Sequence, residues 1–178
     1  LFPYTTLFRS HDDAETGTVV GVDRGRYTVL AGEGRSSSER TVLAMKAREL
    51  GRKSVVVGDH VALVGDTSGD PDTLARIVRI EERRTSLRRT ADDTDPYERV
   101  IVANADQMAI VTALAEPEPR PRMVDRCLVA AYDAGLDPLL VLTKADLADP
   151  APFLSSYAPL DVPYVVTHRG ADGTIDGL

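Results

Sequence analysis

The fold class of this chain is decided by the stretch LLVLTKAD at residues 139–146. Its first four residues form an unbroken apolar run, which is typical of a strand buried on both faces of a parallel sheet. A helix-like segment precedes this run, and Gly135 and Pro138 separate the two. The tetrad TKAD at residues 143–146 therefore follows the carboxyl end of a strand in a βαβ pattern, where open α/β sheets hold their ligands.

The tetrad fits [N/T]-K-x-D, the pattern with which GTPases read guanine. A carboxylate at Asp146 can accept two parallel hydrogen bonds from guanine N1–H and the exocyclic amine, whereas adenine presents neither donor there. The aliphatic stem of Lys144 can lie over the base, and Thr143 can give its hydroxyl to neighbouring loops. The alternative is an ordinary strand-end loop with a solvated Lys and Asp. The surrounding βαβ pattern favours a guanine site at Thr143, Lys144, Ala145 and Asp146.

An ordinary GTPase carries its phosphate loop, G-x-x-x-x-G-K-[ST], upstream of the tetrad. Residues 1–142 contain no such loop, because the Gly-rich stretches at 32–34 and 65–69 lack the Lys-Ser/Thr pair. If the chain is a GTPase, its motifs are permuted and the phosphate loop lies beyond Leu178. We therefore expect the chain to be a fragment.

The first folded module is expected at residues 14–84. Five apolar segments separated by turn signals lie there, at residues 17–22, 26–30, 41–45, 60–64 and 74–81. Such spacing predicts a five-stranded OB-type barrel. Residues 17–90 carry a net charge of +4 and residues 91–178 a net charge of −9. A basic module on an acidic chain predicts local contact with nucleic acid, although solvated surface is the alternative.

Tyr27 is the only aromatic residue of this module, which favours phosphate contact over base stacking. The predicted RNA-binding residues are Arg24, Arg26, Arg35, Arg48, Arg52, Lys53, Arg83, Arg84, Arg88 and Arg89.

A linker, basic and then acidic, is expected at residues 85–98, and a parallel α/β half-domain at residues 99–178. Its expected strands are residues 100–104, 107–114, 139–142 and 163–166. The expected helix carries an apolar stripe and stops at Gly135. The stripe consists of Met123, Cys127, Ala130, Ala131 and Ala134.

Several classes of protein are excluded. The single cysteine, Cys127, excludes a disulfide framework and a cysteine-based zinc site within the chain. The three histidines lack metal-ligand spacing, and no apolar run is long enough to span a bilayer. We expect no catalytic residue and no metal ligand here, a cytoplasmic monomer and no membrane partner.

The first ten residues, LFPYTTLFRS, look like a translated sequencing-library adapter. Residues 1–13 are therefore excluded from the fold, and we expect them to lack regular structure. The natural amino terminus is then lost.

The order of these features resembles a known family. A small barrel, a basic linker, the strand beginning at residues 104–107, a proline-rich loop at 116–121, the helix with DRCL at 125–128 and the TKAD tetrad follow one another. This order is similar to ribosome small-subunit-dependent GTPase A, the RsgA-type circularly permuted GTPases, and to their actinobacterial members. The resemblance covers residues 14–178.

The resemblance implies GTP hydrolysis stimulated by the small ribosomal subunit during its late maturation, with the barrel on ribosomal RNA. It also implies a second base-contacting loop at Thr167, where His168 departs from the small residue usual in the family. The phosphate loop, magnesium site and zinc-binding domain belong to the carboxyl-terminal part, which this sequence lacks. A stand-alone OB-fold RNA-binding protein with a vestigial α/β half is the alternative.

Overall fold

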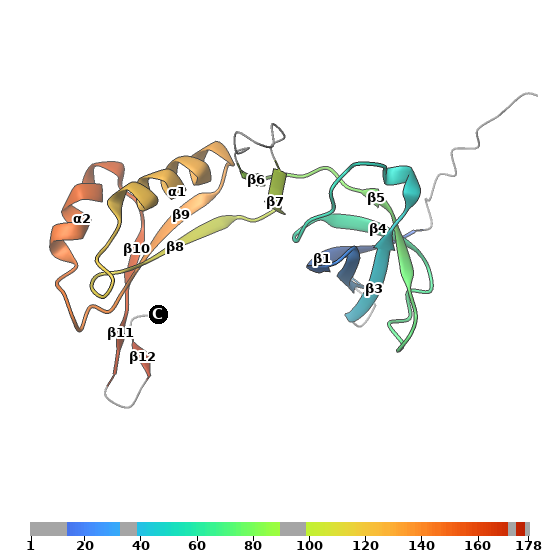
Figure 1. The fold of residues 1–178 in the computed structure, drawn as a ribbon, viewed down its shortest axis with the longest axis horizontal. Helices are drawn as coiled ribbons and strands as arrows, with labels where there is room; N and C mark the ends of the chain where they lie inside the picture. The colour runs from blue at the N-terminus through green and yellow to red at the C-terminus, as the bar shows by residue number, and fades with distance from the viewer. Residues whose placement is uncertain (1–13, 33–38, 90–98, 171–173, 177–178) are drawn as a thin grey trace, which may run out of the picture. The chain divides into compact units, whose positions relative to one another are not determined.

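The structure is a computed structural model that describes residues 14–32, 39–89, 99–170 and 174–176. The predictions for residues 1–13, for Arg35 and for residues 90–98 of the linker fall outside this part. The chain divides into two compact units, Leu1–Arg84 with Arg89–Asn104, and Thr85–Arg88 with Ala105–Leu178. Figure 1 shows the barrel strands in blue to green and the second unit in yellow to red.

The first unit is a closed five-stranded barrel with strand order β1-β2-β3-β5-β4. Only the β3–β5 pairing is parallel. This confirms the predicted OB-type barrel, and each expected strand is present with slightly different ends. The strands are β1 (Glu15–Asp23), β2 (Arg26–Ala31), β3 (Arg40–Lys46), β4 (His60–Gly65) and β5 (Ala75–Ile80), with the short helix η1 (Arg48–Leu50) after β3.

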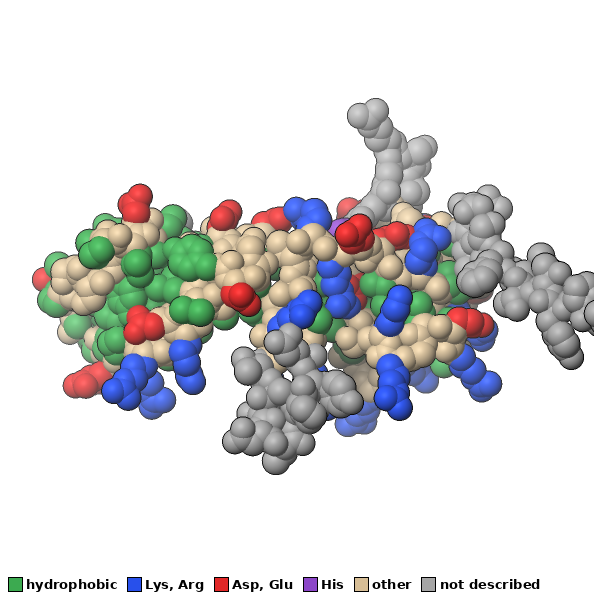
Figure 2. All heavy atoms as spheres, turned by 90° about the horizontal axis from the view of Figure 1, so that it is seen from above, with side chains coloured by type: hydrophobic (Ala, Val, Ile, Leu, Met, Phe, Trp, Pro, Cys, Tyr) green, Lys and Arg blue, Asp and Glu red, His purple; other side chains and the backbone are tan. Residues whose placement is uncertain are grey.

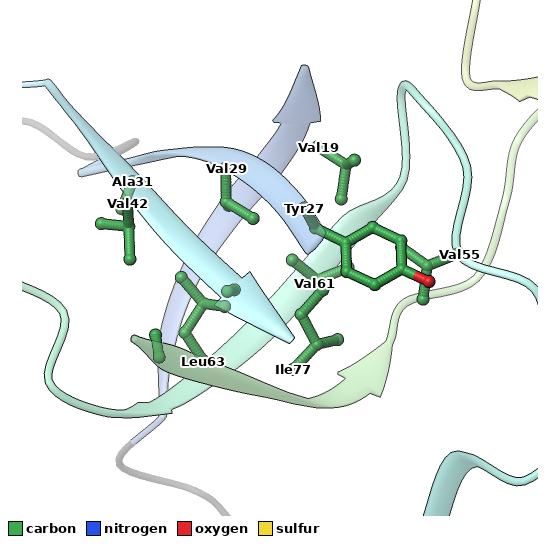
Figure 3. Packing of buried hydrophobic residues seen from close by; sticks show 11 residues of the cluster. Val19, Tyr27, Val29, Ala31, Val42, Val55, Val61, Leu63 and Ile77 are labelled. Atoms are coloured by element: carbon green, nitrogen blue, oxygen red, sulfur yellow. The ribbon is translucent and has the colours of Figure 1, made fainter. Parts of the chain in front are cut away.

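Alternating residues of these strands point inward and form the barrel core (Figure 3). Val29, Val42, Val61 and Ile77 are completely buried. Tyr27 is also part of this core, with 8% of its surface exposed. The only aromatic ring of the predicted RNA-binding module is therefore a packing residue, in agreement with contact through phosphates.

Asp59 is a completely buried carboxylate beside the barrel core. Arg83 donates from Nε to Oδ1 at 2.7 Å and from Nη2 to Oδ2 at 2.9 Å, and Nη2 also donates to the Ser54 carbonyl at 2.8 Å. The backbone N–H of Val56 donates to Oδ2 at 2.8 Å. The hydrogen bond to Asp59 raises the pKa of the Arg83 guanidinium. Since both oxygens accept hydrogen bonds, the buried charge is compensated.

Gly58, next to Asp59, joins the segment at residues 99–104 to the barrel. Its φ is +87°, and a Cβ on it would lie 1.9 Å from the carbonyl oxygen of Ala103, so only glycine fits there. The Ala103 N–H donates to the Val57 carbonyl at 3.0 Å, and Asn104 Nδ2 donates to the Gly58 carbonyl at 2.8 Å. Strand β7 (Arg99–Ala103) is thereby fixed to the barrel unit. Strand β6 (Ser86–Arg89) lies in the segment predicted as a linker.

The second unit contains a three-stranded parallel sheet with strand order β10-β9-β8. This confirms the predicted parallel α/β half-domain. Its elements are β8 (Gln107–Ala113), α1 (Pro121–Asp133), β9 (Asp137–Thr143), α2 (Ala151–Tyr157), η2 (Ala158–Leu160), β10 (Tyr164–Val166), β11 (His168–Arg169) and β12 (Ile175–Asp176).

The predicted apolar stripe of α1 is confirmed at Ala131, which is completely buried, and is wrong at Met123. The buried positions are Val124, Leu128 and Ala131, whereas Met123 is exposed and Cys127 is only partly buried. The predicted stop at Gly135 is confirmed. Gly135 has a φ of +71°, and the next residue, Leu136, donates its N–H to the Ala131 carbonyl at 2.8 Å, which is a Schellman-type end.

Helix α2 was not predicted. It has only seven residues, and its first residue, Ala151, lies between Pro150 and Pro152. Proline is tolerated in a first helical turn, because the N–H groups there have no intrahelical partner. Tyr157 of α2 joins α1 and the sheet in one apolar cluster around Ile110 and Leu140.

We predict that Arg83→Ala destabilises the barrel by about 3–5 kcal/mol, because it leaves the buried Asp59 carboxylate without its cation. The matched control is Arg79→Ala, which removes an exposed ion pair with Glu81 and is expected to cost less than about 1 kcal/mol. Amide hydrogen exchange of Val29 and Val61 measures the opening of the barrel alone. Equal losses of protection in the two variants would contradict the assignment of Arg83 to barrel stability.

Candidate functional site

The predicted guanine-reading tetrad lies where three parallel strands end together. The β8–β9 register runs from Gln107 opposite Asp137 to Ala113 opposite Thr143, and Val166 of β10 lies opposite Leu142. The loops that follow β8, β9 and β10 therefore leave the same edge of the sheet. This is the edge at which open parallel sheets bind ligands.

Backbone hydrogen bonds tie these loops to one another. Leu114 donates its N–H to the Thr143 carbonyl at 2.9 Å, and Thr167 donates its N–H to the Leu142 carbonyl at 2.7 Å. Ala145 in turn donates its N–H to the Thr167 carbonyl at 3.2 Å. The tetrad is thus joined directly to the loop that the family resemblance assigned as the second base-contacting loop.

Lys144 holds the centre of the tetrad in an unusual conformation. Its φ is +61°, in the left-handed region that costs a non-glycine residue about 1–3 kcal/mol. A turn in which Leu147 donates its N–H to the Lys144 carbonyl at 3.0 Å stabilises this conformation. The ammonium group of Lys144 donates to the carbonyl of Glu116 in the loop after β8. Strain of this kind is concentrated at functional sites.

The contribution of Glu116 was missed by the sequence analysis. It enters through a backbone carbonyl, which every residue has, so no residue type marks it in the sequence.

Asp146 presents its carboxylate to solvent. The side chain is exposed, and no donor from the described residues engages it. Both oxygens are therefore able to accept the two parallel donors of guanine. Lys144, whose ammonium group donates to the Glu116 carbonyl, lies two residues before Asp146 in the chain.

The two threonines assigned to guanine binding donate hydrogen bonds to backbone carbonyls of β8 and β9. Thr143 Oγ1 donates to the Thr112 carbonyl of β8 at 3.5 Å. Thr167 is only 4% exposed, and its Oγ1 donates to the Leu142 carbonyl at 3.4 Å. Ala145 contributes its N–H to the same network. The geometry thus brings together all five predicted residues, and Asp146 is the one whose side chain is available to the base.

The residues present fit the guanine end of GTP, but they offer nothing for its metal. The described part of the chain contains no group of three or more His, Cys, Asp or Glu side chains placed to hold a metal ion. Neither magnesium nor zinc can therefore be assigned to residues that the structure describes. Among the described helices, none has the length and apolar composition that crossing a membrane requires.

Five of the predicted RNA-binding residues lie on two neighbouring loops of the barrel. Arg24 and Arg26 belong to the β1–β2 hairpin, and Arg26 lies opposite Met45 at the end of β3. The chain continues from β3 into η1 and the turn after it, which carry the other three cations. All five side chains are exposed. We call this set the basic edge; it consists of Arg24, Arg26, Arg48, Arg52 and Lys53.

The other predicted RNA-binding residues are placed differently. Arg83 binds Asp59, and its guanidinium is mostly engaged. Arg84 is exposed, and its backbone N–H donates to Asn104 Oδ1 at 2.8 Å. Arg88 and Arg89 are exposed on β6. In the view of Figure 2, Lys and Arg side chains are numerous over the barrel unit and form one small group over the other unit.

Comparison with known proteins identifies relatives that match most of the chain. The sequence model of the family described as RsgA GTPase matches residues 80–176. The chain is 34% identical over 163 residues to the "Small ribosomal subunit biogenesis GTPase RsgA" of Gemmatimonas aurantiaca, covering 92% of this chain and 52% of that protein. It is 36% identical over 136 residues to the protein of the same name from Chlorobaculum tepidum, covering 74% of this chain and 44% of the relative.

Solved structures show the same arrangement of elements. The fold resembles YloQ, described as a circularly permuted GTPase, with a TM-score of 0.62 at 21% identity over 90% of this chain and 53% of that one. It resembles YjeQ from Thermotoga maritima with a TM-score of 0.62 at 25% identity over 86% and 51% of the two chains. The chain spans about half the length of these relatives. Because the family model matches more than half of its residues, the chain belongs to the RsgA GTPase family.

Proposed function

We propose that this chain is the RNA-binding barrel and the guanine-reading part of a GTPase that acts in late maturation of the small ribosomal subunit. The observation that carries the proposal is the tetrad at residues 143–146, held at the carboxyl edge of a parallel sheet with the Asp146 carboxylate available. Membership of the RsgA GTPase family supports it, since the relatives are named small ribosomal subunit biogenesis GTPases. A cytoplasmic monomer is part of the proposal.

We also propose that the chain is the amino-terminal portion of a longer protein. It spans 52% and 44% of the two relatives described above. The sheet of the second unit supports the same view. Helices α1 and α2 pack on the face with Ile110 and Leu140, whereas Val111 on the opposite face is 59% exposed. Parallel sheets are normally covered on both faces, so further residues are expected to cover this one.

In the proposed protein, Asp146 selects guanine, Lys144 supports the base, and Thr143, Ala145 and Thr167 hold the loops in place. Bound GTP supplies the phosphoanhydride bond that is hydrolysed. The phosphate loop and the metal site that hydrolysis requires are proposed to lie in the carboxyl-terminal part. Glycine-rich loops and helix amino termini provide most of the affinity for phosphates. The present chain alone is therefore proposed to bind GTP weakly and not to hydrolyse it.

The barrel, residues 14–84, is proposed to bind small-subunit ribosomal RNA through the basic edge, assisted by Arg84, Arg88 and Arg89 across the linker at 85–98. The net charge of +4 on residues 17–90 supports this proposal. Arg83 is proposed to act on RNA only indirectly, because its donors bind Asp59. The GTPase portion, predicted from residue 99, is proposed to begin at residue 105, because residues 99–104 belong to the barrel unit.

We predict that Asp146→Asn in the full-length protein weakens GTP binding about ten- to a hundredfold. The substitution places an amide donor opposite a guanine donor, and a mismatched bond at a charged group costs about 1.5–3 kcal/mol. Binding of xanthosine triphosphate should improve, because xanthine offers an acceptor where guanine offers its amine. Equilibrium titration of both nucleotides measures the change in preference.

Asp137→Asn is the matched control, because Asp137 is an exposed carboxylate at the opposite end of the same strand. An unchanged preference for GTP in Asp146→Asn would show that the tetrad is an ordinary strand-end loop. GTP turnover by residues 1–178 alone would contradict the proposed fragment.

We predict that binding of the chain to small-subunit ribosomal RNA weakens steeply with salt, with a log–log slope of about −0.7 to −0.9 per phosphate neutralised. The variant Arg48→Gln/Arg52→Gln/Lys53→Gln should reduce the magnitude of this slope by about 2, because up to three phosphate contacts are lost. Filter binding or fluorescence anisotropy over a range of salt concentrations measures it.

Arg79→Gln is the control, because Arg79 is already paired with Glu81 at 2.8 Å and should leave the slope unchanged. A salt-independent affinity of the unaltered chain would count against phosphate contact by the barrel.

A further inference from the structure

The second unit carries a concentrated basic surface that the guanine site does not use. Residues 105–178 contain five Lys or Arg residues against eleven Asp or Glu residues, and three of the five cations lie within residues 120–126. They are Arg120, Arg122 and Arg126, at the start of α1 (Pro121–Asp133), and all three are exposed. We call these three residues the arginine cluster.

The arginine cluster surrounds an open hollow of about 620 Å³. Besides the three arginines, Pro121 and Met123 line it. The lining of the hollow therefore combines three arginines with two apolar residues. Each guanidinium is a planar fork of donors that matches the geometry of a phosphate group.

The guanidinium groups of the cluster are not neutralised by neighbouring acids. Among the residues that the structure describes, none forms an ion pair or hydrogen bond with the side chain of Arg120, Arg122 or Arg126. Asp125 is the one acid within the same seven residues, and it has another partner. The hydroxyl of Tyr157 donates to Asp125 Oδ1, with 3.1 Å between the oxygens.

The bond between Tyr157 and Asp125 persists at physiological pH. Burial, followed by the hydrogen bond to Asp125, raises the pKa of Tyr157 to about 12. The hydroxyl therefore stays protonated and remains a donor to the carboxylate. It also lies 3.3 Å from the carbonyl of Pro121, which belongs to the lining of the hollow. Asp125 of α1 is thus bonded to Tyr157 of α2 and forms no ion pair with the arginine cluster, whose guanidinium groups can bind a ligand from outside.

We propose that the arginine cluster is a second RNA-binding surface, which contacts phosphates of the same RNA that the barrel binds. This inference rests on the proposed function, because it takes the RNA of the small subunit as the partner. An acidic peptide is less well matched. Tight peptide interfaces centre on buried aromatic or aliphatic anchors, whereas this surface offers exposed guanidinium groups and only two apolar residues.

A second surface on a separate unit increases affinity without new contacts in the barrel. Two modules on one chain bind one RNA with an effective concentration set by their connection. In a unit that is otherwise acidic, repulsion weakens contact with a polyanion. Three cations gathered within seven residues overcome this repulsion locally and direct the RNA to one place on the unit.

The test compares variants of the full chain binding to in vitro transcribed small-subunit ribosomal RNA. Arg120→Gln/Arg122→Gln/Arg126→Gln should weaken binding and reduce the magnitude of the log–log salt slope by about 2, at about 0.7–0.9 for each lost phosphate contact. The corresponding triple Lys variant keeps the charge and should keep most of the slope. Because none of the three guanidinium groups has a partner among the described residues, the variants should unfold at the same urea concentration as the unaltered chain.

A net-charge control separates local contact from the overall field of the protein. Gln107→Glu/Ala109→Glu/Tyr132→Glu adds three negative charges at exposed positions outside the cluster and gives the same net charge as the triple Gln variant. It should change the slope much less. An equal effect of this control would overturn the proposal. Tighter binding of the arginine cluster to polyglutamate than to RNA would overturn it as well.

The outcomes also separate this inference from the proposed function. If the triple Gln variant binds RNA like the unaltered chain while the basic-edge variant loses affinity, the arginine cluster proposal fails and RNA binding by the barrel stands. If the unaltered chain does not bind RNA at all, both proposals fail.

Discussion

The parallel pairing of β9 with β8 and β10 is the constraint on which the candidate site depends. It makes three strands end at one edge, so that residues from the stretches 112–116, 142–147 and 167 form a single network of loops. The left-handed backbone at Lys144 is stable only because that network holds it. The same network leaves the Asp146 side chain exposed to solvent, with no competing donor among the described residues. The guanine specificity that we propose is therefore a property of the sheet edge as a whole.

A buried carboxylate has a comparable role in the barrel unit. Asp59 is compensated by Arg83 and by a backbone N–H, and its neighbour Gly58 receives the segment at residues 99–104. This arrangement divides the arginines of the module into two kinds. Arg83 is committed to stability, whereas the basic edge stays exposed and available for phosphate. The arginine cluster on the second unit belongs to the second kind, because its side chains are exposed and form no ion pair with a described residue.

The barrel, the parallel sheet and the tetrad could be predicted because they depend on local patterns: alternation in short strands, a continuous apolar run, and glycine at turns. What could not be predicted depends on contacts between distant residues. Arg83 and Asp59 are 24 residues apart, and nothing in a run of arginines shows which one binds a buried acid. Helix α2 was missed because it has only seven residues and prolines lie at its start, a composition that is also typical of a loop. Glu116 acts through its carbonyl, and the hydrogen bond from Tyr157 to Asp125 joins residues that are 32 positions apart.

The central claim is that the loops after β9 and β10 bind guanine in this chain as it stands. Amide NMR of residues 1–178, titrated with millimolar GMP and with AMP, tests it most directly, because a base bound without a phosphate cradle is expected near the millimolar range, about −4 kcal/mol. The account predicts shifts for the amides of Ala145, Asp146, Leu147 and His168 with GMP, absence of these shifts with AMP, and their loss in Asp146→Asn. Equal shifts with both nucleotides, or GMP shifts confined to residues outside these loops, would contradict it.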